Sequence, residues 1–175
     1  MQNEQTLVLI KPDGIQRGLI GEIISRFERS GLKLVGMKMI IPTPDFIEKH
    51  YTVDPEWLGR TGKEVLENLK KFMSSGPVVA MAWQGAHAVG IVRKLVGKTE
   101  PLNSDVGTIR GDFTIDSYQM ADRDSRAVRN IIHASDESKN AKKEIGLWFK
   151  DEELLNYRLI NEAILYDTNL DGILE

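Results

Sequence analysis

The sequence of 175 residues contains no cysteine. Disulfide scaffolds, thiolate zinc sites and cysteine nucleophiles are therefore excluded. No apolar run approaches the ~20 residues that a membrane-spanning helix requires, and the first five residues lack the basic region and apolar core of a signal peptide. The formal net charge is −3. This charge argues against a surface that is basic throughout, which is the kind of surface that binds nucleic acids or acidic membranes. These absences predict a soluble cytoplasmic protein.

The glycine loops that commonly bind phosphate are also absent. The chain has no G-x-G, which excludes the dinucleotide-binding fingerprint and the glycine loop of protein kinases. Two glycine pairs have the G-x-x-x-x-G spacing, Gly31 with Gly36 and Gly85 with Gly90, but neither pair is followed by Lys-Ser or Lys-Thr. If the chain binds phosphate, side chains must hold it.

What the sequence does contain fits one globular domain. Hydrophobic residues make up 41% of the chain and charged residues 28%, a balance typical of a folded protein. Short apolar runs that stop at proline or glycine predict strands, and apolar stripes at helical spacing predict helices. The expected strands are residues 6–11, 32–41, 77–83 and 130–133. The expected helices are 19–27, 45–51, 65–73, 88–96, 136–149 with Asp136 as N-cap, and 151–166, with a loop at 107–113.

This order of elements suits two architectures. One is a parallel α/β sheet, and the other is the split βαβ or ferredoxin-like plan, with helices packed on a four-stranded sheet. The chain is short, and its last expected strand has only about four residues, near the low end of normal. Spacing alone does not decide between the two.

His133 has the most distinctive position of the three histidines. It lies at the exit of an expected buried strand and just before a helix N-terminus, where the helix dipole favours anions. Lys11 ends the first expected strand, Arg93 lies on an otherwise apolar helix, and Arg110 lies in a glycine-containing segment that lets the backbone approach a ligand. Arginine pairs well with phosphate oxygens, and neutral imidazole is a ready nucleophile near pH 7. Together these residues indicate a phosphate site, although a lone histidine in such a place is more often structural.

Five collinear motifs carry a resemblance to a known family. They are Lys11-Pro-Asp-Gly14, Arg17-Gly-Leu-Ile-Gly-Glu22, Ser75-Gly-Pro-Val-Val-Ala-Met81, Gly107-Thr-Ile-Arg-Gly-Asp-Phe113 and Asn130-Ile-Ile-His-Ala-Ser-Asp136. In this order they resemble the nucleoside diphosphate kinase family, from about Thr6 to Phe149. The resemblance implies a ferredoxin-like α+β fold with a four-stranded antiparallel sheet. It also implies a single domain over residues 1–175, with its core at 6–149 and a C-terminal helix and tail at 150–175.

The resemblance further implies an activity and the residues that perform it. His133 would take the γ-phosphoryl group of a nucleoside triphosphate and pass it to a nucleoside diphosphate, so that kinetics are ping-pong through a phosphohistidine. Lys11 would assist, and Glu144 with Ser135 would orient the imidazole. Mg²⁺ would enter on the nucleotide phosphates, with no metal held by the protein alone. Nucleotide contacts would come from Lys11, Tyr51, Trp57, Arg93, Thr99, Arg110 and Asn130, with Trp57 as the candidate for stacking on the base.

The chain departs from the family pattern in an insert at residues 114–129. The insert directly precedes the strand that carries His133, so it is expected to line or cover the site. The arginines at 123, 126 and 129 could contact a nucleotide or pair with Asp122 and Asp124, and the pairing is the favoured expectation. The tail after Phe149 is also extended, and its apolar residues are expected to dock on a neighbouring subunit: Ile164, Leu165, Leu170, Ile173 and Leu174.

Partners and rival functions follow from the same comparison. The family forms tetramers or hexamers, so a homo-oligomer is expected, with no membrane and no specific nucleic acid as partner. A non-catalytic nucleotide-binding module, for which His133 would be dispensable, stays open as an alternative. So does a nucleic-acid-binding ferredoxin-like domain, although the sequence lacks paired aromatic and basic strand motifs. Protein-histidine phosphotransfer is a further possible side activity.

Overall fold

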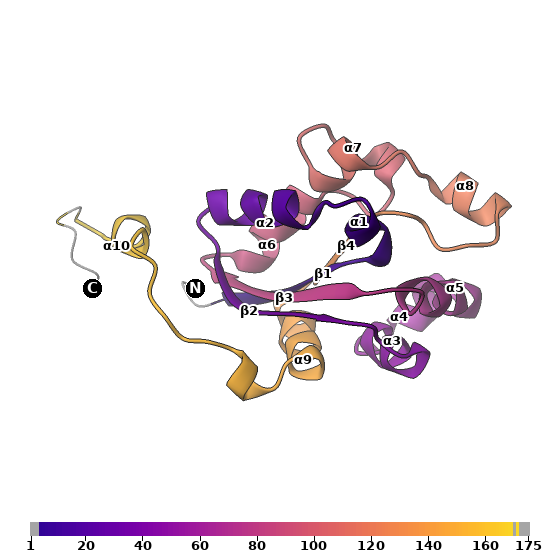
Figure 1. Cartoon of the computed structure of the whole chain (residues 1–175), viewed down its shortest axis with the longest axis horizontal. Coiled ribbons are helices and arrows are strands. Elements are labelled where there is room, and N and C mark those ends of the chain that lie inside the picture. Colours follow the sequence, from indigo (N-terminus) through magenta and orange to yellow (C-terminus); the bar gives the residue numbers. More distant parts are fainter. Residues whose placement is uncertain (1–3, 170, 172–175) are drawn as a thin grey trace.

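The computed structural model describes residues 4–169 and 171 and places four strands of this part of the chain in one sheet (Figure 1). The strands are β1 (Glu4–Ile10), β2 (Lys33–Ile40), β3 (Val78–Gly85) and β4 (Ile132–Ala134). Their order across the sheet is β2-β3-β1-β4, and every neighbouring pair is antiparallel. The expectation of a four-stranded antiparallel sheet is confirmed, and the parallel alternative is wrong.

The helices cover both faces of this sheet and one of its ends. They are α1 (Pro12–Gln16), α2 (Ile20–Arg29), α3 (Pro44–Tyr51), α4 (Trp57–Thr61), α5 (Lys63–Met73), α6 (Ala88–Val96), α7 (Ile109–Phe113), α8 (Tyr118–Arg123), α9 (Ser138–Trp148) and α10 (Glu162–Leu165), with 3₁₀ turns η1 (Pro101–Asn103) and η2 (Asp151–Glu153). Figure 1 shows α2 and α6 on one face and α9 on the other, with α3, α4 and α5 grouped at one end of the sheet. Within the described residues, no helix combines the length and the apolar character needed to cross a membrane.

β1 is buried on both faces, because successive side chains of a strand point to opposite sides. Leu7 and Leu9 pack with residues of α3, α5 and α9, whereas Val8 and Ile10 pack with residues of α2 and α6. The continuous apolar run that predicts this strand is thus typical of a strand covered on both sides. Lys11 follows directly, at the end of a strand held firmly in the core.

Two predicted features near the sheet are wrong. The sequence predicts a loop at 107–113, but α7 forms there because the Thr108 hydroxyl accepts a hydrogen bond from the Gly111 N–H at 3.1 Å and caps the helix. The sequence also predicts Asp136 as the N-cap of α9, whereas the N-cap is Glu137. The Asp136 carboxylate instead accepts a hydrogen bond from Asn140 Nδ2 at 3.0 Å.

The predicted helix over 151–166 is wrong as well. Only η2 and α10 are helical there, and the residues between them follow the edge of β2. The Leu155 N–H donates to the Val35 carbonyl at 2.7 Å, and the Tyr157 hydroxyl donates to the Leu34 carbonyl at 2.6 Å. An edge strand presents backbone groups that need partners, and pairing with them displaces a helix of modest propensity.

The C-terminal segment then docks on its own chain. Glu162 forms an ion pair with Lys33 at 2.9 Å, and the Leu165 side chain covers Gly31. Leu165 thus contacts its own chain and is still 49% exposed, so its docking on a neighbouring subunit stays a prediction. Ile164 is exposed. Leu170, Ile173 and Leu174 lie outside the described residues.

Candidate active site

A strained turn before β4 places His133. Ile131 has a φ of 55°, in the left-handed region that β-branched residues rarely adopt. Its N–H donates to Asp13 Oδ2 at 3.1 Å, and its carbonyl accepts a hydrogen bond from the Lys11 N–H at 2.9 Å. Gly14 approaches so closely that a Cβ on it would lie 2.9 Å from the Ile131 oxygen. Strain of this kind persists where surrounding contacts enforce it, so the turn at residues 11–14 fixes the strand that carries His133.

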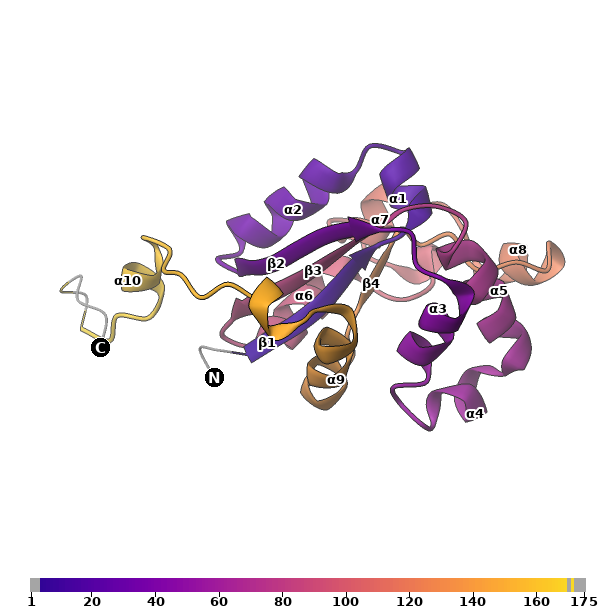
Figure 2. The same cartoon turned by 60° about the horizontal axis from the view of Figure 1, so that its bottom comes forward.

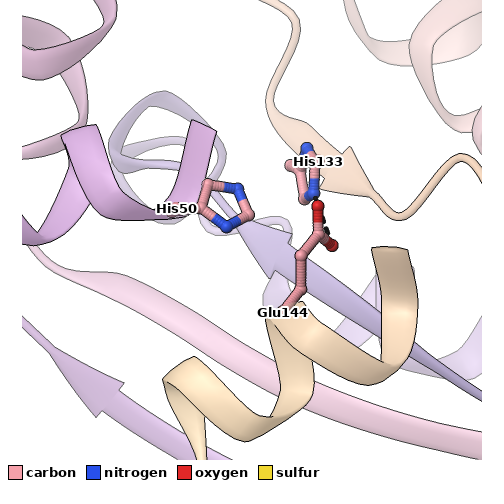
Figure 3. Close-up of side chains that lie close together, drawn as sticks. All are labelled: His50, His133 and Glu144. Carbon is pink, nitrogen blue, oxygen red and sulfur yellow. Dashed lines mark hydrogen bonds and ion pairs between the residues drawn. The ribbon is translucent and has the colours of Figure 1, made fainter. Parts of the chain in front are cut away.

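The His133 imidazole is oriented by the Glu144 carboxylate on α9 (Figure 3). His133 Nε2 lies 3.2 Å from Glu144 Oε2, and Ser135 Oγ donates to the same oxygen at 2.5 Å. Burial opposes ionisation of Glu144, but its interactions with His133 and Ser135 prevail and lower its pKa to about 2. Because an ionised carboxylate only accepts hydrogen bonds, the imidazole proton lies on Nε2. Nδ1, which points away from Glu144 in Figure 3, keeps its lone pair free for nucleophilic attack.

His50 on α3 is a second imidazole packed against the first. The ring centres of His50 and His133 lie 4.5 Å apart, with the planes at 84°. Trp148 Nε1–H donates to His50 Nδ1 at 3.2 Å, and burial lowers the pKa of His50 to about 3. The single proton of this neutral ring therefore lies on Nε2, which has no hydrogen-bond partner in the described part of the chain.

This tautomer decides whether the cluster could hold a metal ion. His50, His133 and Glu144 each offer one possible ligand atom, and these atoms lie within 4.8 Å of one another. A histidine binds a metal through an unprotonated nitrogen. In His50 the Trp148 N–H occupies one nitrogen and the proton occupies the other, and His133 shares its Nε2 proton with Glu144. The cluster is therefore suited to orienting an imidazole and poorly suited to binding a metal.

Lys11 and Asn130 form a polar bridge beside His133. Lys11 Nζ donates to Asn130 Oδ1 at 2.7 Å, and Asn130 Nδ2 donates to the Thr99 carbonyl at 2.8 Å. Burial, together with the nearby Arg110 charge, lowers the pKa of Lys11 to about 7. The ammonium group is thus close to its titration point at neutral pH, and an anion placed beside it would favour the charged form.

Arg110 is anchored by backbone carbonyls. Its guanidinium donates to the carbonyls of Gly97 at 3.1 Å, Ile132 at 2.6 Å and Asn130 at 3.4 Å. Burial and the charge of Arg93 lower its pKa to about 10, so it is a cation at neutral pH. Within the described residues no carboxylate forms an ion pair with it, and its charge is available to an anionic ligand.

Most of these side chains line one cleft of about 710 Å³. Its lining includes buried side chains such as Lys11 and Arg110 and exposed residues of α5 and α8 such as Val65 and Asp122. Nine of the site residues expected from the sequence line this cleft: Lys11, Tyr51, Trp57, Arg93, Thr99, Arg110, Asn130, His133 and Glu144. Ser135 does not line it and lies behind Glu144 as a hydrogen-bond donor.

Comparison with known proteins identifies the family of this chain. A family model described as nucleoside diphosphate kinase matches residues 4–154. The chain belongs to the nucleoside diphosphate kinase family. A nucleoside diphosphate kinase of Pyrobaculum aerophilum is 43% identical, and the match covers 89% of this chain and 100% of that protein. Nucleoside diphosphate kinase III, chloroplastic/mitochondrial, of Arabidopsis thaliana is longer: it is 48% identical over 95% of this chain and 63% of its own length.

The fold of the nucleoside diphosphate kinase family is also evident in solved structures. A transition state mimic of the nucleoside-diphosphate kinase from Borrelia burgdorferi, with bound vanadate and ADP, superposes with a TM-score of 0.90 at 43% identity. The superposition covers 94% of this chain and 97% of that one. The family resemblance and the fold expected from the sequence are therefore confirmed.

Several residues that line this cleft are not predicted from the sequence. Val65 and Leu69 on α5 line it, although their helical spacing indicates only core packing. The sequence holds no signal for Val65, because only the structure shows that this member of the apolar stripe is 43% exposed. Trp57, the expected stacking residue, lies against Tyr51 with ring centres 5.0 Å apart. Nothing in the spacing of His50 indicates its contact with His133.

The arginines of the insert behave partly as expected. Arg123 and Arg126 form ion pairs with Asp124 at 2.8 and 3.3 Å, so that part of the prediction is confirmed. The predicted pairing with Asp122 is wrong: its carboxylate has no ion pair or hydrogen bond within the described residues. Arg129 lies over an aromatic ring of α5, 4.4 Å from the ring centre. Asp122 lines the cleft with several other residues of the insert.

Proposed function

We propose that the chain is a nucleoside diphosphate kinase, which converts ATP and a nucleoside diphosphate into ADP and a nucleoside triphosphate. One observation carries the proposal: His133 presents an unprotonated Nδ1 in a cleft shared with Lys11, Arg93 and Arg110. Family membership supports the same reaction, as does the likeness to a relative solved with vanadate and ADP.

In the proposed first half-reaction His133 Nδ1 attacks the γ-phosphorus of the triphosphate. The new N–P bond forms as the bond to the β,γ-bridging oxygen breaks, and the diphosphate leaves with that oxygen. The ring becomes positively charged because Nε2 keeps its proton, and the ionised Glu144 stabilises that charge. The second half-reaction reverses these steps on a different diphosphate, which gives ping-pong kinetics.

The cations supply most of the catalytic effect in this proposal. Phosphoryl transfer needs little covalent chemistry beyond the nucleophile, so positioning and charge neutralisation dominate. Lys11, Arg93 and Arg110 would bind the phosphate oxygens, and Asn130 and Thr99 would extend that contact towards the ribose. Burial raises the pKa of the Tyr51 hydroxyl, which keeps it as a neutral donor beside the transferred group.

The proposal treats Mg²⁺ as part of the nucleotide substrate. Hard cations such as Mg²⁺ favour oxygen ligands and commonly bind through substrate phosphates. The nearest cluster of possible ligands, formed by His50, His133 and Glu144, is committed to orienting the nucleophile. Mg²⁺ bound to the phosphates would neutralise charge on them during transfer.

Labelling with [γ-³²P]ATP tests the proposed function. The protein should acquire label that is stable in alkali and labile in acid, as a phosphoramidate is, and addition of a nucleoside diphosphate should remove it. A non-catalytic nucleotide-binding module would bind ATP without acquiring label. A nucleic-acid-binding domain would retain labelled RNA on a filter and acquire none. Protein-histidine phosphotransfer as a side activity would appear as label on an added protein.

We also propose a homo-oligomer, a tetramer or a hexamer. β2 is an edge strand, and Met37, Met39 and the following Ile41 are all more than half exposed there. Exposed apolar side chains grouped on an edge strand are typical of a surface that associates. A Met39→Asp variant should elute from size exclusion as a smaller species than the native chain, with unchanged secondary structure by circular dichroism. An unchanged elution volume would place the interface elsewhere.

Two expectations from the sequence complete the proposal. The chain would act as one domain, with the core at residues 6–149 and the C-terminal segment appended to it. It would act in the cytoplasm, which cell fractionation tests directly.

A further inference from the structure

The insert forms a fixed second wall of the cleft. Arg126 donates through its two terminal nitrogens to Asp116, at 2.6 and 2.9 Å, and these bonds lower the pKa of Asp116 to about 2. The same carboxylate accepts a hydrogen bond from the Arg129 N–H at 2.6 Å. A bidentate arginine–carboxylate pair fixes geometry as well as charge. In both Figure 1 and Figure 2, α8 lies at the same end of the molecule as α5.

Two further contacts secure this wall at its ends. The Tyr118 N–H, at the start of α8, donates to Glu100 Oε1 at 2.8 Å. Ala127, after α8, is buried in the same core cluster as Leu66 and Leu69 of α5. The wall is therefore held from both sides, and the polar groups that it presents to the cleft have defined positions.

Asp122 and Ser125 are two residues of this wall whose polar side chains are unused. Both residues line the cleft, and both are exposed. Neither side chain has a hydrogen bond or ion pair within residues 4–169 and 171. Their neighbours differ in this respect, since Asp124 pairs with Arg123 and Arg126. Two unpaired polar side chains on a rigid cleft wall are available to a ligand.

Ser125 is held in a backbone conformation that favours glycine. Its φ is 47°, and the Arg126 N–H donates to the Ala121 carbonyl at 3.0 Å across this turn. Many helices end with such a hydrogen bond across a residue in the left-handed conformation. Glycine usually occupies that position, because a side chain there lowers stability. Strained residues other than glycine cluster at ligand sites. The hydroxyl of Ser125 thus lies on the cleft wall at a local cost that glycine would not incur.

The lining of the cleft gives a nucleotide one favoured orientation. The phosphates would lie with Lys11, Arg93 and Arg110, whose charges act on one another. The base would then lie against the apolar surface of Val65 and Leu69 on α5, which shares a core cluster with Ala127 of the insert. A flat base between these walls would bring its polar edge towards the exposed part of the insert.

We propose that Asp122 and Ser125 recognise the edge of the base and favour guanine nucleotides. This inference rests on the proposed function. A carboxylate accepts hydrogen bonds only, and guanine offers N1–H and an adjacent amino group to it, with O6 left for the serine hydroxyl. Adenine and cytosine offer one amino group each. Uracil and thymine offer a single N3–H, and the carbonyl oxygens on both sides of it repel the carboxylate, which disfavours them.

The test measures how fast different diphosphates remove label from the phosphorylated full-length protein. The second-order rate constant should be about tenfold larger for GDP than for UDP, as expected for one hydrogen bond to a charged group. Asp122→Asn should bring the ratio of the two constants close to one. The lower ratio should come from a slower reaction with GDP. The amide in Asp122→Asn has no negative charge, and its NH₂ group cannot accept the hydrogen bonds that guanine donates.

Ser125→Gly separates recognition from stability. Removing the side chain relieves the left-handed strain, so the melting temperature should stay the same or rise. The GDP to UDP ratio should nevertheless fall. Ser125→Ala keeps the strain and loses the hydroxyl, and it should lower the ratio to the same extent. A ratio that falls only in the glycine variant would assign the effect to backbone freedom and overturn the role of the hydroxyl.

Asp124→Asn is the matched control for charge. It removes the same charge two residues away, and its side chain does not line the cleft. Its GDP to UDP ratio should equal that of the native chain. If Asp122→Asn and Asp124→Asn slow both diphosphates equally, Asp122 acts only through long-range charge and the inference fails. Equal rates for GDP and UDP with the native protein overturn it too, while leaving the proposed function intact. Failure to acquire label at all overturns the proposed function instead.

Discussion

Replacement of His133 by alanine is expected to abolish phosphoryl transfer. Loss of a covalent nucleophile commonly costs at least about four orders of magnitude in rate. The neighbouring imidazole cannot substitute for it, because His50 Nδ1 accepts the Trp148 N–H and Nε2 carries the proton. The variant should acquire no alkali-stable label from [γ-³²P]ATP, and its turnover of nucleoside diphosphates should fall to background.

Two controls show that such a loss is chemical rather than structural. His133→Asn keeps a side chain of similar volume, so it should melt close to the native temperature, bind ADP and still acquire no label. Glu144→Gln removes the charge that fixes the tautomer but leaves the nucleophile in place. Its rate should fall by roughly tenfold to a hundredfold, with label still on His133. Label on the alanine variant would move the nucleophile to another residue.

The fold was predictable where local pattern and tertiary environment agree. The apolar run of β1 predicts a strand, and the structure covers this strand on both faces of the sheet. A buried strand is the element that best suits five consecutive apolar or small polar side chains followed by Lys11. The helix predicted over 151–166 failed for the opposite reason. Its stripe of apolar residues is compatible with a helix. In the structure the Leu155 N–H and the Tyr157 hydroxyl instead donate hydrogen bonds to carbonyls at the sheet edge, those of Val35 and Leu34. Such competition is invisible in a local pattern.

The candidate site divides in the same way. Lys11 and His133 lie in motifs that the sequence displays, and the structure brings both into one cleft. The role of His50 depends on Trp148, which lies 98 residues away in the chain. Within the part of the chain that the structure describes, Asp122 is left unpaired because Arg126 pairs with Asp116 and Asp124 instead, and Asp116 lies ten residues before Arg126. Where the role of a residue depends on a partner far away in the chain, that role can be recognised only in the three-dimensional structure.

The activity is expected to decline above about pH 7 because Lys11 loses its charge. Burial is the main cause that lowers the pKa of this ammonium from 10.5 to about 7. The group is cationic below that pH and neutral above it, so the free protein attracts phosphate less strongly as the pH rises. If the neutral form is inactive, kcat/KM for ATP should fall about tenfold per pH unit on the alkaline side. Bound phosphate favours the charged form, so kcat should decline at higher pH than kcat/KM.

Two substitutions decide whether Lys11 is the group that titrates. Lys11→Arg keeps a positive charge throughout this range, because an arginine stays protonated, so the alkaline decline of kcat/KM should disappear even where its level is reduced. Lys11→Met is uncharged at every pH and should give a low, flat profile at the level that native protein approaches in alkali. The measurement is the rate of phosphoprotein formation across the pH series, with melting temperature recorded at each pH. An alkaline decline that persists in Lys11→Met assigns the titration to a different residue, and the cation that attracts the phosphates at neutral pH is then Arg93 or Arg110.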